Sequence, residues 1–320
     1  MENKEQYIIL RLLSIKGFGP KTINKLIDGL HRIDNDLPDL LIDHNLFKKI
    51  LPSIKEEQIK DFFENNYELD TQFEEAKSQG YKFLPITSKL YPRKIIESLK
   101  FAAPPILTYK GNLQLIDYDS VGFCGSRQAS TKGISVAQDC AEQLVAHSIS
   151  ILSGYAAGVD QATHYSALKY GGSTIIVLPE SILNFSIRNN LKEVWDWNRV
   201  LVISEFSLNA IWTTSRAMLR NSTIISLSDI MILIESSKNG GSMDAGRKTL
   251  GLNKKLFVPV YEGMPEFAIG NRVLLENGAI KLMKSKNTGK ADIRNLLEAL
   301  KENHSTIYST YKQTEIDFSH

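Results

Sequence analysis

The chain has 320 residues, of which 42% are hydrophobic and 23% are charged, so it can bury a sizeable core as a soluble globular protein with one large and one smaller domain. Its formal net charge of +2 is too small to indicate a polyanionic partner, and any nucleic-acid role must therefore come from a local patch. The start MENKEQ carries no apolar signal core, and apolar runs such as STIIVLP are far shorter than a membrane span, which predicts a cytoplasmic protein with no membrane partner.

Residues 1–68 are predicted to form a small helical domain. Within it, LLSIKGFGPKTINKLID has a helical run, a turn at Gly17 and Gly19, and a second run led by Pro20. This order resembles a helix-hairpin-helix, whose glycine turn exposes backbone amides that bind a phosphate, and it makes Gly17, Gly19 and Lys21 the predicted contacts. An ordinary helix connection with a glycine cap accounts for the same residues, so both interpretations stay open.

Residues 69–285 carry the pattern of a larger α/β domain. A strand candidate, ILTYKG, is followed from Val121 onward by seven short apolar runs that alternate with amphipathic helical stretches. The runs are VGFC, SISIL, STIIVL, RVLVIS, DIMILIE, KKLFVPV and AIKLM. Such alternation predicts parallel pairing through right-handed crossovers, and hence a doubly wound, mostly parallel sheet.

The segment after the first run shows the helical period most clearly. One stripe holds Ala137, Cys140, Ala141, Leu144 and Val145, and Ser130 or Thr131 is available as the N-cap. Residues 286–320 are expected to add one polar helix and a flexible tail. Cys124 and Cys140 are expected to be reduced core residues, and the lack of a histidine, cysteine and acid cluster with ligand spacing predicts no metal and no cofactor.

The loops that follow the predicted strands are rich in glycine, serine and asparagine. Ligands of doubly wound sheets bind outside the carboxyl ends of the strands, so these loops are the segments to inspect. Neither G-x-G-x-x-G with an acid after the second strand nor G-x-x-x-x-G-K-[ST] is present. Loop amides, helped by Ser126, Ser153 and Ser242, nevertheless suit phosphate groups, and Arg127 adds a bidentate donor unless it is only salt-bridged at the rim of the sheet.

Across about residues 80–283 the ordered motifs resemble the DNA-processing protein A family (DprA, also called Smf). The matching segments are YPRKIIESLKFAAPPILTYKGNLQLI, GFCGSRQAST, SGYAAGVDQATHYSALKYGGSTIIVL, the pairs Ser204-Glu205 and Arg220-Asn221, NGGSMDAGRKTLG and GNRVLLENGA. The resemblance implies an extended Rossmann-like domain that forms a homodimer, binds single-stranded DNA without catalysing a reaction, and loads the recombinase RecA during natural transformation or serves a related defence role.

The resemblance also implies which residues contact the strand. The phosphate pocket would hold Gly125, Ser126, Arg127, Ser153, Gly154, Arg220, Asn221, Gly240, Gly241 and Ser242. Tyr155 and Asn190 complete the predicted set, and Phe185, in a predicted rim loop, is the candidate for base stacking. His164 is expected to be a packed structural residue and Asp160 to cap the second helix of the domain.

This chain departs from the family at two cationic positions. Ala157 and Ser222 stand where the family usually has arginines, so the chain is interpreted as a divergent member with weaker phosphate contacts. One alternative is therefore a nucleotide-sensing regulator or antitoxin-like protein that binds a protein partner. A second alternative is a nucleoside monophosphate phosphoribohydrolase, but its glutamate is missing here, since Gly246, Arg247 and Lys248 occupy the segment where it would lie.

Overall fold

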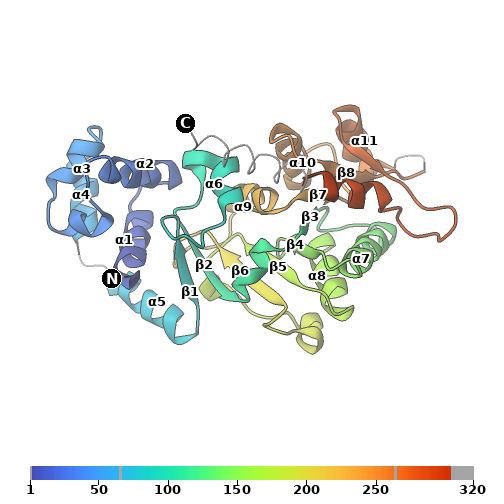
Figure 1. Ribbon diagram of the computed structural model, residues 1–320, viewed down its shortest axis with the longest axis horizontal. Coiled ribbons are helices and arrows are strands. Elements are labelled where there is room, and N and C mark those ends of the chain that lie inside the picture. The colour runs from blue at the N-terminus through green and yellow to red at the C-terminus, as the bar shows by residue number, and fades with distance from the viewer. Residues whose placement is uncertain (1, 65–66, 263–264, 304–320) are drawn as a thin grey trace, which may run out of the picture. The chain divides into compact units, whose positions relative to one another are not determined.

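The computed structural model describes residues 2–64, 67–262 and 265–303 (Figure 1). Its strands form a nine-stranded sheet with the order β1-β2-β6-β5-β4-β3-β7-β8-β9. The strands are β1 (Lys82–Pro85), β2 (Ile106–Gly111), β3 (Ser120–Cys124), β4 (Ser150–Ser153), β5 (Thr174–Leu178), β6 (Val200–Ser204), β7 (Ile230–Leu233), β8 (Leu256–Pro259) and β9 (Ile280–Leu282).

Helices connect most of these strands and build the N-terminal part of the chain. They are α1 (Glu2–Ser14), α2 (Pro20–His31), α3 (Asn45–Ile50), α4 (Glu56–Phe63), α5 (Tyr67–Ser78), α6 (Arg93–Leu99), α7 (Thr131–Val145), α8 (Val159–Lys169), α9 (Thr214–Leu227), α10 (Gly241–Gly251) and α11 (Ile269–Glu276). Short 3-10 turns are η1 (Leu37–Leu41), η2 (Lys100–Ala102), η3 (Leu113–Asp117), η4 (Ile182–Asn184), η5 (Asn189–Val194) and η6 (Glu266–Ala268). None of the described helices is long and apolar enough to cross a membrane.

The sheet is mostly parallel, as the sequence pattern predicted. β3 pairs in parallel with β4 and β7, so that Val121 lies opposite both Ile151 and Ile230. The pairs β4–β5, β7–β8 and β8–β9 are parallel too, whereas β2 is antiparallel to both β1 and β6. All seven apolar runs from residue 121 onward are strands, and ILTYKG is β2.

The connections make the sheet doubly wound. Helices α7 and α8 connect β3 to β4 and β4 to β5, which extends the sheet in one direction from β3. Helices α10 and α11 connect β7 to β8 and β8 to β9, which extends it in the opposite direction. Because parallel crossovers are right-handed, the two helix pairs cover opposite faces. The predicted α/β class is confirmed.

One hydrophobic core packs between α7 and the sheet, and it confirms the predicted apolar stripe of α7. Ala137, Cys140, Ala141 and Leu144 are buried, Val145 packs partly against them, and the Ser130 side chain accepts a hydrogen bond from the Gly133 amide as the N-cap. A helix over residues 294–303 joins the same core. The side chains of Leu296, Ala299 and Leu300 in this helix, and of Ile293 just before it, are at most 5% exposed. The helix is therefore amphipathic, and the expectation of a polar helix was wrong because its apolar residues recur at helical spacing.

One link between strands differs from the predicted helical pattern. Between β5 and β6 the chain forms the 3-10 turns η4 and η5 and no α-helix. Side chains stabilise this irregular backbone: the Ser181 hydroxyl accepts from the Leu183 amide, and the Arg199 guanidinium donates to the carbonyls of Leu168 and Gly172. The Arg199 contact with Leu168 joins residues 31 positions apart, so it cannot be predicted from the spacing of apolar residues within one segment.

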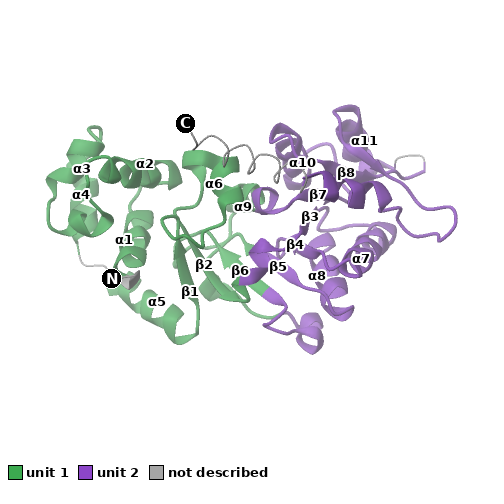
Figure 2. Cartoon of the chain, in the orientation of Figure 1, with its two compact units in different colours: residues 1–113, 177–187, 201–223 green, residues 114–176, 188–200, 224–320 purple. Residues whose placement is uncertain are grey.

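The chain divides into two compact units, each of which combines several segments (Figure 2). The first contains residues 1–113, 177–187 and 201–223, and the second contains residues 114–176, 188–200 and 224–320. The domain boundaries at residues 68 and 285 that the sequence suggests stay predictions.

Candidate phosphate-binding site

The loop after β3 carries the predicted GSR motif within the second unit. Gly125 lies so close to α8 that a Cβ atom would sit 2.5 Å from Val159 Cγ2, which explains why this position has no side chain. The Ser126 hydroxyl accepts a hydrogen bond from the Gln128 amide at 3.1 Å and so tightens the turn. Arg127 is exposed beside it, where its guanidinium is accessible to solvent.

A second loop, which leads from β4 into α8, packs against the GSR backbone. Gly158 has a φ of +76°, and a Cβ there would lie 2.4 Å from the Ser126 carbonyl oxygen. The Val159 amide also donates to that carbonyl at 3.4 Å. Only glycine combines this left-handed backbone with so close an approach, so the structure brings the two predicted loops together at Gly158.

The floor of the second loop is formed by buried polar side chains. Ser153 is fully buried and its hydroxyl donates to the Phe123 carbonyl at 2.8 Å, so it joins β4 to β3. His164 is fully buried, with its ring nitrogens 2.6 Å from the Gly154 carbonyl oxygen and 2.6 Å from Thr174 Oγ1. The prediction that His164 is structural is thus confirmed by its contacts.

Asp160 supports this loop in a way that differs from the expected helix cap. The N-cap of α8 is Gly158, and the Asp160 carboxylate accepts from the Ala156 amide at 3.1 Å. The expectation was wrong because the carboxylate reaches back into the loop, two residues before the cap. Asp160 therefore closes the turn that contains the half-buried Tyr155 and the exposed Ala157.

Arg188 is a cation at this loop that motif reasoning missed. Its guanidinium donates to the carbonyls of Tyr155 and Ala156, and its Cζ atom lies 4.4 Å from the centre of the Tyr155 ring. Its backbone amide also donates to the Tyr155 hydroxyl. Burial raises the pKa of Tyr155, and the amide and charge of Arg188 oppose that shift. Arg188 thus supplies positive charge to the segment in which Ala157 supplies none.

A third loop, after β7, holds the predicted Gly240, Gly241 and Ser242. Gly240 is the N-cap of α10 with a φ of +108°, and a Cβ at Gly240 or Gly241 would meet nothing within 4 Å. Both glycines are exposed and Ser242 is half-buried. The space around these amides leaves room for a ligand to approach the backbone.

Two buried side chains that the sequence did not single out hold this third loop. Glu235 is fully buried and accepts hydrogen bonds from the amide and the hydroxyl of Ser130 at the start of α7. Asn271, also fully buried, accepts from the Ser236 amide at 3.0 Å and donates to the Ile234 carbonyl at 2.9 Å. Burial and the Glu235 carboxylate raise the pKa of the Tyr261 hydroxyl.

Three of the remaining predicted site residues, Phe185, Arg220 and Asn221, lie in the first unit. Phe185 follows η4, whereas Arg220 and Asn221 lie on α9, where Arg220 is only 5% exposed. Asn190 belongs to η5 in the second unit and is exposed. The structure therefore brings together the GSR loop and the loop after β4, and it assigns Phe185, Arg220 and Asn221 to the other compact unit.

The N-terminal segment has the order of helix, glycine turn and helix on which the resemblance to a helix-hairpin-helix rests. α1 ends at Ser14, Gly17 has a φ of +88°, and α2 begins at Pro20. The Gln58 amide nitrogen donates to the Lys16 carbonyl at 2.9 Å and so occupies one side of the turn. Lys21 is exposed on the first turn of α2, and its predicted phosphate contact stays a prediction.

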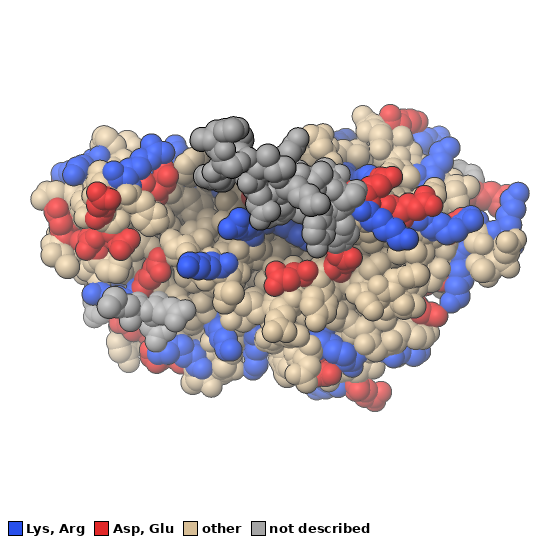
Figure 3. Space-filling view, in the orientation of Figure 1, with Lys and Arg blue, Asp and Glu red and all other residues tan. Residues whose placement is uncertain are grey.

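No group of three or more metal-ligating side chains is found among the residues that the structure describes. On the face drawn in Figure 3, lysine and arginine side chains are interspersed with aspartate and glutamate, as the net charge of +2 suggests. Any anion selectivity must therefore come from local geometry at the loops.

Known proteins have sequences similar to that of this chain. DNA processing protein DprA of Streptococcus pneumoniae is 28% identical over 226 residues, which cover 70% of this chain and 78% of that protein. Protein Smf of Synechocystis is 25% identical over 292 residues, which cover 87% of this chain and 70% of that protein.

Solved structures agree with the fold. The X-ray structure of DNA processing protein A from Streptococcus pneumoniae matches with a TM-score of 0.73 at 24% identity, over 87% of this chain and 94% of that one. The structure of DNA processing protein A from Helicobacter pylori, which concerns that protein's single-stranded DNA binding mode, matches with a TM-score of 0.56 at 25% identity, over 71% of this chain and 96% of that one. The model of the family described as DNA recombination-mediator protein A matches residues 82–295, and this chain belongs to that family.

Proposed function

We propose that this chain binds single-stranded DNA through the loops after β3, β4 and β7, without catalysing a reaction on it, and acts as a mediator of DNA recombination. The observation that carries the proposal is the contact of Gly158 with the Ser126 and Arg127 backbone, which sets an exposed guanidinium beside two glycine-containing loops. A phosphate diester suits this arrangement, because amides and a guanidinium donate to its oxygens without reading a base. Family membership and the single-strand binding mode of the Helicobacter pylori protein support the same ligand.

The contacts we propose are those the sequence singled out, with different roles. Gly125, Ser126, Arg127, Gly240, Gly241 and Ser242 would approach the backbone phosphates, with Tyr155 and Asn190 beside them. Gly154 is buried and would shape its loop from below. Ser153 would act from below, since its hydroxyl is bonded to Phe123. Arg220, Asn221 and Phe185 belong to the first unit, and their DNA contacts stay predictions.

The test is fluorescence anisotropy with labelled oligothymidylate at a low and a high salt concentration. Arg127→Ala is expected to weaken binding and to flatten the dependence of log affinity on log salt by roughly 0.7, the slope for one lost single-strand phosphate contact. Arg247→Ala is the matched control, because Arg247 is exposed on α10 but is no proposed contact. If wild-type protein fails to bind at low salt, or if both variants bind like wild type, this function is refuted.

The proposal also covers the oligomeric state of the protein, its location and its protein partner. We infer a homodimer in the cytoplasm that loads the recombinase RecA onto single strands during natural transformation or a related defence process. The helix-hairpin-helix-like turn at Gly17, Gly19 and Lys21 would add a second phosphate contact. RecA filament formation on single strands, measured with and without this protein, tests the loading role.

A regulator that binds a protein partner is the second candidate, and the absence of arginine at positions 157 and 222 favours it. Capture of the same partner from the native host before and after nuclease treatment would support direct protein contact. The hydrolase alternative lacks support in the segment where its acid is expected. There Gly246 packs on Leu274, and Asp244 pairs with Lys248 at 2.8 Å. Release of free base from nucleoside monophosphates by the purified protein would support the hydrolase alternative.

A further inference from the structure

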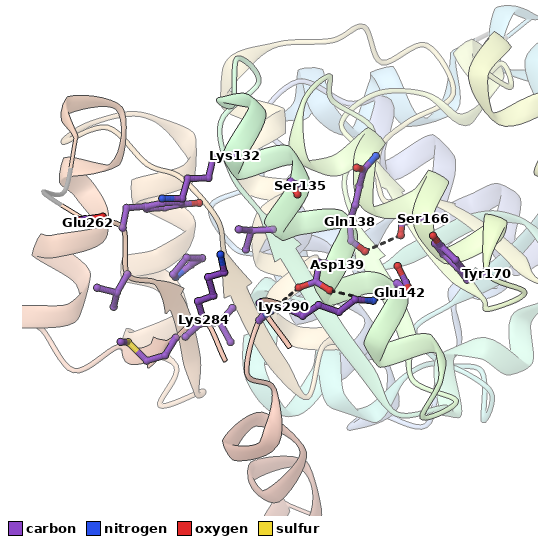
Figure 4. A pocket seen from close by; sticks show the side chains of 18 of the residues that line it. Lys132, Ser135, Gln138, Asp139, Glu142, Ser166, Tyr170, Glu262, Lys284 and Lys290 are labelled. Carbon is purple, nitrogen blue, oxygen red and sulfur yellow. Dashed lines mark hydrogen bonds and ion pairs between the residues drawn. The ribbon is translucent and has the colours of Figure 1, made fainter. Parts of the chain in front are cut away.

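A cavity of about 670 Å³ opens in the second unit, away from the three loops (Figure 4). Its walls come from α7, from α8, and from the segments that follow β8 and β9. Figure 4 shows Lys132 on α7 and Lys284 after β9 at the same opening, on side chains that come from different walls. The proposed phosphate loops do not line this cavity, so its chemistry needs its own explanation.

Three charged side chains that line the cavity bind one another and connect α7 to the turn after β9. The Lys290 ammonium lies 3.0 Å from Glu142 Oε1 and 3.8 Å from Asp139 Oδ1. Asp139 also accepts from the Ala291 amide at 2.6 Å, and a bridge pairs Lys284 with Ala291. The two carboxylates on α7 therefore fasten the turn after β9, and Lys290 offsets one of their two negative charges.

The lining of the cavity carries four lysines and three acids, which gives it a net charge of +1. Lys132 lies with its ammonium 5.5 Å from the centre of the Tyr261 ring, and Lys284 is exposed. Within the described part of the chain, neither lysine has a carboxylate in ion-pair range. Glu262 is the third acid on the wall, beside Asp139 and Glu142. Exposed lysines without carboxylate partners, held over a cavity, suit an anionic ligand.

Tyr165 connects this cavity to the proposed phosphate loops. Gln138 and Tyr165 line both the cavity and a second, smaller depression, whose other lining residues include Gly158 and Asn190. Gly158 contacts the Ser126 and Arg127 backbone. We call the two depressions together the α7–α8 groove. Tyr165 is half-buried in it, with the Lys169 ammonium 5.7 Å from its ring centre.

We propose that the α7–α8 groove holds the continuation of a single DNA strand beyond the three loops, with Lys132 and Lys284 as phosphate contacts and Tyr165 as a base-stacking surface. This inference rests on the proposed function and specifies the path of its ligand. Single-strand grooves combine backbone-tracking cations with aromatic faces, and Lys132, Lys284 and Tyr165 supply both kinds of group to the lining of this groove. A longer strand then binds more tightly because it reaches contacts that a short one does not.

The test compares two labelled oligothymidylates, of about 4 and about 16 nucleotides, the span typical of single-strand binding domains. The variant Lys132→Ala/Lys284→Ala is expected to leave the short oligonucleotide unaffected. For the long one it should flatten the salt dependence by roughly 0.7 per lost contact. Lys286→Ala is the matched control, because Lys286 is an exposed lysine two residues after Lys284 that does not line the cavity.

The stacking role is tested at Tyr165. Replacement by leucine should weaken binding of the long oligonucleotide by about fivefold to a hundredfold, the range for one lost base–aromatic stack, whereas Tyr165→Phe should bind like wild type. If wild type and Arg127→Ala differ as expected but the groove variants match wild type on the long strand, the groove is refuted and the loop site stands. A wild-type protein that binds neither oligonucleotide refutes both.

Discussion

Glu235 and Ser130 join the end of β7 to the start of α7 through two hydrogen bonds. The Ser130 amide donates to Glu235 Oε2 at 2.8 Å, and the Ser130 hydroxyl donates to Oε1 at 2.5 Å. The same serine oxygen accepts from the Gly133 amide, so one buried carboxylate positions the N-cap of the helix that follows the GSR loop. The loops after β3 and β7 are thereby held in one arrangement.

Removing this carboxylate should destabilise the second unit. Glu235→Ala is expected to lower the free energy of unfolding by about 1.5–3 kcal/mol, because it leaves the part-buried amide and hydroxyl of Ser130 without a charged acceptor. Glu235→Gln should cost less, since its amide oxygen still accepts one bond. Urea unfolding followed by circular dichroism measures both, with the exposed Glu262→Gln as control. Equal midpoints for Glu235→Ala and Glu262→Gln would contradict the role of this contact.

Gly133 is expected to be intolerant of a methyl group for the same reason. A Cβ there would lie 2.3 Å from Glu235 Oε1, so Gly133→Ala must displace the carboxylate, at a cost of about 1–3 kcal/mol. Gly251→Ala, at the end of α10, meets nothing within 4 Å and should gain about 0.5 kcal/mol from reduced backbone freedom. Thermal unfolding of the two variants separates the effects. A Gly133→Ala protein as stable as Gly251→Ala would show that Glu235 has room to move.

Gly158 should matter for binding as well as for stability. Gly158→Ala adds a Cβ 2.4 Å from the Ser126 carbonyl oxygen and should push the GSR loop away, with a loss of oligothymidylate affinity. Gly171→Ala shares the left-handed backbone, with a φ of +82°, but meets nothing within 4 Å. Both variants should lose about 1–2 kcal/mol of stability from that conformation. If affinity falls equally in both, backbone strain rather than loop displacement is responsible.

Restoring a cation at position 157 should strengthen DNA binding. Ala157 is exposed in the loop that contacts Arg127, so Ala157→Arg adds a guanidinium without disturbing the core. The salt dependence of oligothymidylate binding should steepen by roughly 0.7 if the new side chain contacts one phosphate. Ala157→Gln provides a long polar side chain without charge and should leave the slope unchanged. An unchanged slope in Ala157→Arg would place the strand elsewhere.

Lys21 distinguishes the two interpretations of the N-terminal turn. If the turn binds a phosphate, Lys21→Ala should flatten the salt dependence of binding by roughly 0.7. Lys49→Ala, which removes an exposed lysine from α3, should not change it. If the two variants behave alike in anisotropy titrations, the turn is an ordinary helix connection.

Local sequence patterns were enough for the elements and for part of the site. The seven apolar runs, the buried stripe of α7 and its Ser130 cap were all predicted, because each depends on residues only a few positions apart. The GSR and SG motifs pointed to the two loops that Gly158 brings into contact. The Arg188 contacts with Tyr155 and Ala156 were not predicted, because no short motif links residues more than 30 positions apart.

The sequence by itself therefore determined the order of strands and helices, the α/β class and the loops where an anion would be sought, since hydrophobic period and glycine placement are local properties of the chain. The tertiary structure decided which buried polar groups hold those loops. Glu235 meets Ser130 across 105 positions, and Asn271 reaches Ser236 across 35. Such pairings depend on how the crossovers pack against the sheet, and a hydrogen bond between distant segments leaves no periodic trace in the order of residues.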